Sequence, residues 1–212
     1  MFVIKQMILD LLLSLPALVI ALTVHEYAHG LVAYKMGDPT AKYSGRLSLN
    51  PMDHLDPVGT LCLLLFHFGW AKPVPINPMN FKHQRKGVIL VSLAGPFANF
   101  ITALIFAFIL GAMGRFLTAN TLTVFLYQVV QYVMVLNVGL MVFNLIPIPP
   151  LDGSKVLAEI LPYRYRYRMY ELERYSTLIF IAFILLNNRI PFLGYLSRAV
   201  LIFIQFLVGL VF

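Results

Sequence analysis

The chain has 212 residues, of which 60% are hydrophobic and only 12% are charged, and its mean hydropathy is +0.82. Soluble globular proteins carry about 25% charged residues, so this composition excludes a soluble domain and predicts an all-α polytopic membrane protein, built as a single domain over residues 1–212. The net charge of +7 does not indicate a nucleic-acid partner, since in a membrane protein the positions of Lys and Arg matter more than their sum, and the single Cys62 excludes an internal disulfide.

The first apolar run, about residues 7–34, predicts a membrane span that carries three ionisable side chains, His25, Glu26 and His29, near its C-terminal end. Each ionisable group in hydrocarbon costs at least about 2.5–3.5 kcal/mol on insertion scales, so three within about one helical turn indicate a function. Residues i and i+4 share a face of an α-helix, so both imidazoles can bind one Zn²⁺. Glu26 beside them can act as a general base toward a metal-bound water.

Between the first and second spans the sequence predicts short, irregular elements. Residues 42–50 partly alternate polar and apolar side chains, which predicts a short strand. Residues 52–70 contain the apolar run 61–66, which is too short to cross a bilayer and predicts a buried or re-entrant segment. Residues 71–78 contain three prolines and are expected to be extended, pairing with the strand in a small cytoplasmic-side β-sheet.

Four further apolar runs predict membrane spans, which gives about five transmembrane helices in all. The expected spans are residues 87–113, 122–146, 175–186 and 192–212. A loop with Pro147, Pro149 and Pro150 follows the 122–146 span and leads into a short helix over about residues 153–161. Next comes a Tyr- and Arg-rich patch, residues 163–170, which suits a lipid headgroup interface.

The positions of Lys and Arg predict the orientation. Residues 35–86 hold seven of them and residues 155–174 hold five, whereas the intervening turn has only Arg115 and the late turn only Arg189. Cytoplasmic loops carry the excess of Lys and Arg, so with five spans both rich regions are cytoplasmic and the N-terminus is outside. The first span then ends in the cytoplasm, which places the His-Glu motif toward the cytoplasmic side of a multi-pass protein of the cell membrane.

Two histidines do not complete a catalytic zinc site, which usually has three protein ligands and one open position. Asp152 is a candidate for the third ligand, because prolines break the chain just before it and Gly153 permits a close backbone approach. The charge distribution also brings Asp152 to the same depth as His29. Spacing alone leaves other histidines and carboxylates open, namely His54, His67, His83, Asp10, Asp38, Asp53, Asp56, Glu159, Glu171 and Glu173.

Three segments on three successive spans resemble the signatures of one family. They are His25-Glu-Tyr-Ala-His29, Ala94-Gly-Pro-Phe-Ala-Asn99, and the stretch from Asn144 through Pro147 to Leu151-Asp-Gly153. In this order they resemble the site-2 protease family, the intramembrane zinc metalloproteases of the peptidase M50 type, and in particular its small prokaryotic branch without a PDZ or CBS domain. The resemblance covers about residues 7–160, the expected catalytic core, and leaves about residues 172–212 as C-terminal helices.

The resemblance implies a role for each residue of the site. The implied ligands of one Zn²⁺ per chain are His25, His29 and Asp152. Glu26 is implied as the general base and later proton donor, Asn144 as a donor to the substrate peptide or the developing oxyanion, and Asn99 as a support for the site.

The function that the resemblance implies is hydrolysis of peptide bonds inside transmembrane segments of other proteins, near the cytosolic face. The expected partners are therefore a transmembrane protein substrate and the lipid bilayer. A helical substrate has to unwind before it is cut, and we expect the strand over residues 42–50 to pair with the extended segment.

Other interpretations of the same residues stay open. His25 and His29 are also consistent with buried structural histidines or haem ligands, Asn99 with a helix-packing hydrogen bond, and Asn144 with a cap on the broken helix. One alternative function is a catalytically silent membrane chaperone or adaptor, which the presence of Glu26 disfavours. Another is a metal carrier, which needs several intramembrane polar sites along a path, whereas this sequence has one cluster.

Overall fold

The structure, a computed structural model, describes residues 2–59, 71–189 and 191–212, and over these ranges it is helical without any strand. The long helices are α1 (Phe2–Met36), α4 (Gln84–Phe116), α5 (Thr121–Asn144) and α9 (Phe192–Gly209). The shorter helices are α2 (Thr40–Tyr43), α6 (Asp152–Ile160), α7 (Tyr163–Glu173) and α8 (Ser176–Arg189), with 3-10 turns η1 (Pro51–Asp53) and η2 (Pro78–Asn80).

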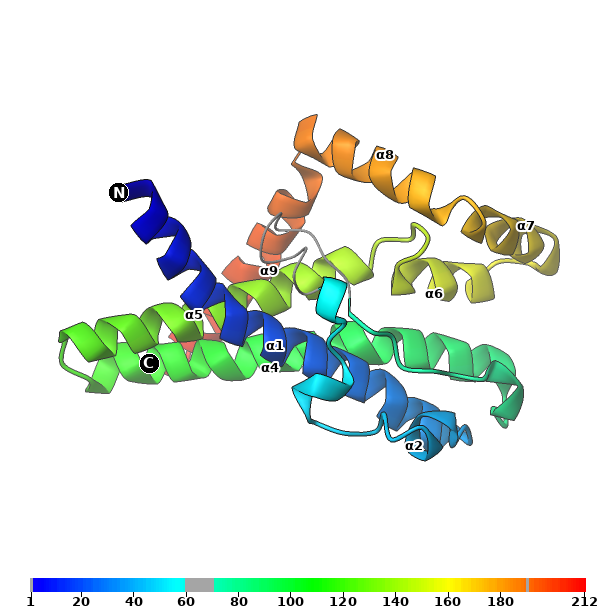
Figure 1. The fold of residues 1–212 in the computed structure, drawn as a ribbon, viewed down its shortest axis with the longest axis horizontal. Helices are drawn as coiled ribbons and strands as arrows, with labels where there is room; N and C mark the ends of the chain where they lie inside the picture. The colour runs from blue at the N-terminus through cyan, green and yellow to red at the C-terminus, as the bar shows by residue number, and fades with distance from the viewer. Residues whose placement is uncertain (1, 60–70, 190) are drawn as a thin grey trace.

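Helices α1, α4 and α5 pack against one another and form the centre of the molecule. In Figure 1, α4 and α5 run side by side while α1 crosses them at an angle. Helix α9 packs against both α4 and α5, and the core between these three helices contains Ala103, Ala107, Met134, Val138 and Ile204. Small side chains such as the two alanines let membrane helices approach closely, since packing rather than the hydrophobic effect drives their association.

Four described helices are long and apolar enough to cross a membrane: Leu11–Met36, Gln84–Phe116, Thr121–Asn144 and Phe192–Gly209. They confirm four of the predicted spans as helices, and α6 confirms the predicted short helix. The fifth predicted span, residues 175–186, falls in α8, which has 14 residues and a length of roughly 21 Å at 1.5 Å per residue. That is shorter than the ~30 Å hydrocarbon core, so the count of five spans is not confirmed.

The predicted strand over residues 42–50 is wrong. Residues Thr40–Tyr43 form helix α2, and Gly45 turns the chain with a φ of 67°, in the left-handed region that favours glycine. The pairing that does occur in this part of the described chain is one isolated antiparallel bridge between Leu55 and Ala71. The small β-sheet is therefore not confirmed.

The absence of a strand pair in this part of the described chain is explained by residues 71–78, here called the proline-rich strap. Apart from the bridge at Ala71, where the Lys72 N–H donates to the carbonyl of His54 at 2.9 Å, its backbone groups bind side chains. Its prolines have no N–H to donate, which rules out a regular ladder. The buried Arg46 donates through Nη2 to the carbonyls of Lys72 and Pro73, at 2.6 and 3.3 Å. The Val74 N–H donates to Glu26 Oε2 at 3.0 Å, so the strap lies directly against the His-Glu segment of α1.

Asp38 ties the other end of the strap to the end of α1. This fully buried carboxylate follows Gly37, whose φ is 110°, and it accepts from the backbone N–H of Asn77 at 2.7 Å and from Asn80 Nδ2 at 2.8 Å. Burial alone would raise the pKa of Asp38, but hydrogen bonds from Thr40, Asn80 and Asn77 outweigh it and hold the pKa below its ordinary value.

The prediction of a re-entrant segment over residues 52–70 falls largely outside the described residues, because its apolar run 61–66 lies between the two described ranges. Of that segment, the structure describes η1 and the residues up to Gly59.

Candidate metal centre

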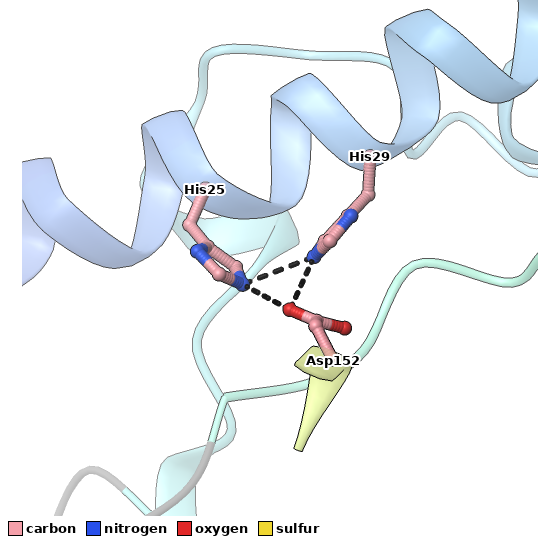
Figure 2. Close-up of side chains that lie close together, drawn as sticks. All are labelled: His25, His29 and Asp152. Carbon is pink, nitrogen blue, oxygen red and sulfur yellow. Dashed lines mark hydrogen bonds and ion pairs between the residues drawn. The ribbon is translucent and has the colours of Figure 1, made fainter. Parts of the chain in front are cut away.

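His25 and His29 lie one turn apart on α1, and both are buried. Their Nε2 atoms are 3.0 Å apart, and Asp152, the first residue of α6, places its Oδ2 3.2 Å from each of them. Figure 2 shows the three side chains pointing toward one another from α1 and from the start of α6. Three potential ligand atoms from segments more than 120 residues apart in sequence therefore converge on one point.

Hydrogen bonds on the far side of each ring determine which nitrogen carries the proton. His29 Nδ1 lies 2.7 Å from the carbonyl oxygen of Val91, and His25 Nδ1 lies 2.6 Å from Asn99 Oδ1. Both oxygens are acceptors, so both Nδ1 atoms must carry the hydrogen. In the neutral imidazoles that bind a metal, the two Nε2 atoms then face the centre with their lone pairs.

The donor set fits a divalent cation. Two imidazole lone pairs and a carboxylate oxygen at 3.0–3.2 Å repel one another unless a positive charge lies between them. A tetrahedral zinc site with bonds of about 2.0–2.1 Å holds its ligands roughly 3.3 Å apart, close to these separations. Nitrogen and carboxylate ligands suit zinc, and three protein ligands leave a fourth position open.

Two glycines make room for this arrangement. A Cβ built on Gly95 of α4 would lie 2.5 Å from His25 Cε1 and 2.5 Å from His29 Nε2, so only glycine lets α4 pass beneath both rings. A Cβ on Gly153 would collide with the backbone of Leu145 and Ile146, so only glycine lets the chain turn tightly enough to present Asp152. Both glycines belong to the sequence motifs, and packing explains why those motifs need them.

Arg85 ties the C-terminal end of α6 to α4, and a contact within α6 positions the Asp152 carboxylate. Arg85 of α4 donates to the carbonyls of Glu159 and Ile160, at 2.5 and 3.0 Å, and satisfies the carbonyl end of α6. Within the first turn of α6, Lys155 Nζ lies 3.5 Å from Asp152 Oδ1, the carboxylate oxygen that does not face the histidines. These contacts orient Asp152 with Oδ2 toward α1.

Glu26 and Asn144 lie in the wall of a cavity of about 470 Å³ that the three converging side chains also line. The cavity wall is otherwise mainly apolar, with Leu22, Leu140 and Phe143 among its residues. The half-buried Glu26 accepts from Val74 N–H, and Asn144 Nδ2 donates to its own helix at Leu140 O, 3.1 Å away. The cavity therefore offers one carboxylate and one amide beside the metal-ligand cluster.

Asn99 occupies a different place from Asn144. It is fully buried behind His25, where its Nδ2 donates to Ala21 O at 3.0 Å and to Asn137 Oδ1 at 2.8 Å. Asn99 thus contacts His25 and is not among the residues that line the cavity.

The other ionisable candidates lie elsewhere in the described chain. His54 is buried and pairs with the carbonyl of Ser48 at 2.7 Å, and His83 immediately precedes α4. Glu159 accepts from Arg166 at 2.8 Å and from Tyr170 at 2.6 Å; burial and this carboxylate raise the pKa of Tyr170 to about 12. His67 lies outside the described residues.

Sequence reasoning missed Asn137 and the strap residue Val74. The only signal for Asn137 is its position seven residues before Asn144, which places both amides on about the same face of α5. Nothing in the sequence indicates that the Val74 N–H reaches Glu26, because this contact depends on how the strap folds over α1.

Comparison with known proteins places the chain in a family. Residues 111–187 match the model of the family described as Peptidase family M50. The chain is 43% identical over 167 residues to the Bacillus subtilis (strain 168) protein named "Putative zinc metalloprotease YwhC", an alignment that covers 77% of this chain and 76% of that protein. No solved structure matches the chain.

Two mycobacterial proteins named "Putative zinc metalloprotease Rip2" are also similar. The protein from Mycolicibacterium smegmatis is 31% identical over 142 residues, and the one from Mycobacterium tuberculosis (strain H37Rv) is 31% identical over 144 residues. Each alignment covers 65% of this chain, but only 52% and 53% of the relative, so the chain spans about half the length of the Rip2 proteins. With its apolar helices and these relatives, the chain belongs to peptidase family M50, the site-2 protease family, and is a membrane zinc metalloprotease.

Proposed function

We propose that this protein hydrolyses peptide bonds within transmembrane segments of other membrane proteins, with one Zn²⁺ per chain held by His25, His29 and Asp152. The observation that carries the proposal is the convergence of three lone-pair donors, 3.0–3.2 Å apart, beside a carboxylate in an apolar cavity. This cavity lies among helices that are long and apolar enough to span a membrane.

Bound zinc supplies a Lewis acid that polarises the scissile carbonyl and lowers the pKa of water to about 7. Glu26 accepts the proton of the attacking water and later returns it to the leaving nitrogen. The Val74 N–H, 3.0 Å from Oε2, supports this role because it holds the carboxylate within the cavity while the second oxygen stays available for the proton.

The cavity suits an unwound apolar peptide. A substrate helix hides its scissile carbonyl in its own hydrogen bonds, so it must open locally before it is cut. The apolar wall formed by Leu22, Leu140 and Phe143 then covers apolar side chains, and Asn144 can turn its amide from Leu140 O toward the exposed peptide or the oxyanion.

The distribution of basic residues supports a site toward the cytoplasmic side of the cell membrane. His25 and His29 lie in the second half of the apolar stretch Leu11–Met36, which leads into the Lys- and Arg-rich residues 35–86. By the positive-inside rule that region is cytoplasmic, and a site near its boundary gives water a short path to the catalytic centre.

The test compares detergent-purified wild type with Glu26→Gln for bound zinc and for cleavage of a model transmembrane substrate. Glu171→Gln, at an exposed position on α7, is the matched control. We expect about one zinc per chain in all three proteins and cleavage by wild type and control, with a loss of at least about 100-fold in Glu26→Gln. Zinc binding without cleavage by wild type would favour a silent scaffold, and absence of zinc would contradict the proposed site.

A further inference from the structure

A row of buried side chains crosses the three central helices behind the metal-ligand cluster. Asn137 of α5 accepts from Asn99 of α4 at 2.8 Å, and Asn99 in turn accepts from His25 of α1 at 2.6 Å. Both asparagines are completely buried, so water cannot replace any of these contacts.

The orientation of the Asn99 amide decides the tautomer of His25. With Oδ1 toward the ring, His25 must carry its hydrogen on Nδ1, and Nε2 keeps the lone pair that a metal needs. If the amide turned over, its NH₂ group would donate to Nδ1. The ring hydrogen would then lie on Nε2 and block the ligand position.

Two acceptors hold Asn99 in the productive orientation. Its Nδ2 donates to Ala21 O at 3.0 Å and to Asn137 Oδ1 at 2.8 Å. The Asn137 amide is oriented in its own right, because its Nδ2 donates to Val133 O at 2.8 Å and this leaves Oδ1 to face Asn99. A reversed Asn99 would bring its carbonyl oxygen against two oxygens, which is strongly unfavourable in a dry interior.

We propose that Asn137 is a positioning residue of the zinc site: by accepting from Asn99 it keeps His25 in the tautomer that can bind the metal. The inference rests on the zinc site proposed above and assigns a role to a residue of α5 that touches neither metal ligand nor substrate cavity. Removing a group that hydrogen-bonds a metal-ligating histidine lowers metal affinity by about 10- to 100-fold, and Asn137 acts through such a group, Asn99.

The experiment uses the full chain in detergent with three variants. Asn137→Leu has nearly the same size and lacks the acceptor. Asn137→Asp keeps an oxygen toward Asn99, and its buried carboxyl stays protonated, so it can still donate to Val133 O. Gln131→Leu removes an amide from an exposed position of the same helix and is the matched control.

Two quantities are measured on each protein. The zinc dissociation constant comes from competition with a chelator, and the His25 tautomer of the zinc-free protein comes from imidazole ¹⁵N chemical shifts. We expect Asn137→Leu to bind zinc about 10- to 100-fold more weakly and to show a population of His25 with the hydrogen on Nε2. We expect Asn137→Asp and Gln131→Leu to match wild type in both measurements.

A double variant separates orientation of Asn99 from general packing. In an Asn99→Asp background residue 99 pairs directly with the His25 N–H, as in carboxylate–histidine–zinc triads, and is therefore ionised, unlike the carboxyl in Asn137→Asp. Both of its oxygens are then acceptors, so the His25 tautomer no longer depends on which way residue 99 points. The effect of Asn137→Leu on zinc affinity should then largely disappear, whereas a purely structural role would weaken zinc binding equally in both backgrounds.

The proposal is overturned if Asn137→Leu binds zinc like wild type, if Asn137→Asp is as impaired as Asn137→Leu, or if His25 of the wild type already has its hydrogen on Nε2. If Asn137→Leu does not fold, the His25 tautomer is compared in wild type and Asn137→Asp, and a His25 hydrogen on Nε2 in either protein overturns the proposal. A wild type that binds no zinc contradicts the metal site itself, and the imidazole shifts of the zinc-free proteins still decide whether Asn137 sets the tautomer.

Discussion

Replacing Gly95 with alanine should abolish tight zinc binding while leaving the helix intact. The added Cβ would lie 2.5 Å from His25 Cε1 and from His29 Nε2, whereas carbon atoms in favourable contact are about 3.5–4.0 Å apart. One or both rings must therefore retreat by roughly 1 Å, several times the ~0.2 Å within which metal–ligand distances normally hold. Neither ring can retreat freely, because its Nδ1 is held by Asn99 or Val91.

The expected result for Gly95→Ala is zinc affinity lower by at least about 100-fold, measured by chelator competition, with no cleavage of the model substrate. Alanine favours a helix over glycine by about 1 kcal/mol, so the helix content by circular dichroism should not fall. Gly139→Ala on α5 is the control, since a Cβ there meets no atom of the described residues within 4 Å. Wild-type zinc affinity in Gly95→Ala would refute the assigned ligand geometry.

Three further outcomes are expected. The lowered pKa of Asp38 stabilises the folded protein fully above the unfolded-state pKa of 3.8, and this stability is lost as the pH falls below that value. The unfolding temperatures of wild type and Asp38→Asn should therefore converge in acid, and a difference between them that does not change with pH would count against this. A chelator should lower the unfolding temperature of wild type, since zinc at 100 times its dissociation constant adds about 2.7 kcal/mol, but should not change that of Asp152→Ala. Arg46→Gln should release the strap from its anchor and reduce cleavage about 10- to 100-fold with zinc retained, whereas Lys42→Gln, at an exposed position, should cleave at the wild-type rate. Equal cleavage rates in Arg46→Gln and wild type would exclude a role for the strap in placing Glu26.

The transmembrane helices were predictable because each is an uninterrupted apolar run, and an isolated backbone in lipid must form its hydrogen bonds within the helix. The predicted span 87–113 lies within α4, and the predicted span 122–146 overlaps almost all of α5. Residues 175–186 were harder, because hydropathy does not show that the described helix at this position, Ser176–Arg189, has only 14 residues.

The strand over residues 42–50 failed for a reason that the local sequence does not contain. Its alternating pattern predicts pairing, but the potential partner, residues 71–78, pairs with the backbone of residues 54–55 at one end and otherwise binds side chains. Arg46 takes two of its carbonyls, while Glu26 and Asp38 take the N–H groups of Val74 and Asn77. These contacts join residues 26 to 48 positions apart and depend on the tertiary fold.

The site was partly predictable. Helical spacing places His25 and His29 together, but spacing alone left Asp152 among many carboxylates, and only the family resemblance selected it. The structure brings all three side chains to one point. Asn137 escaped notice because its importance depends on the register of α5 against α4, which determines that it meets Asn99 and not lipid.

The most direct test of the zinc site is X-ray absorption at the zinc edge of the purified protein. We predict one zinc per chain with nitrogen and oxygen neighbours at about 2.0–2.1 Å and the outer-shell scattering of two imidazoles, one of which disappears in His29→Ala. A protein without zinc, or a zinc spectrum that is unchanged by His29→Ala, would contradict the centre formed by His25, His29 and Asp152.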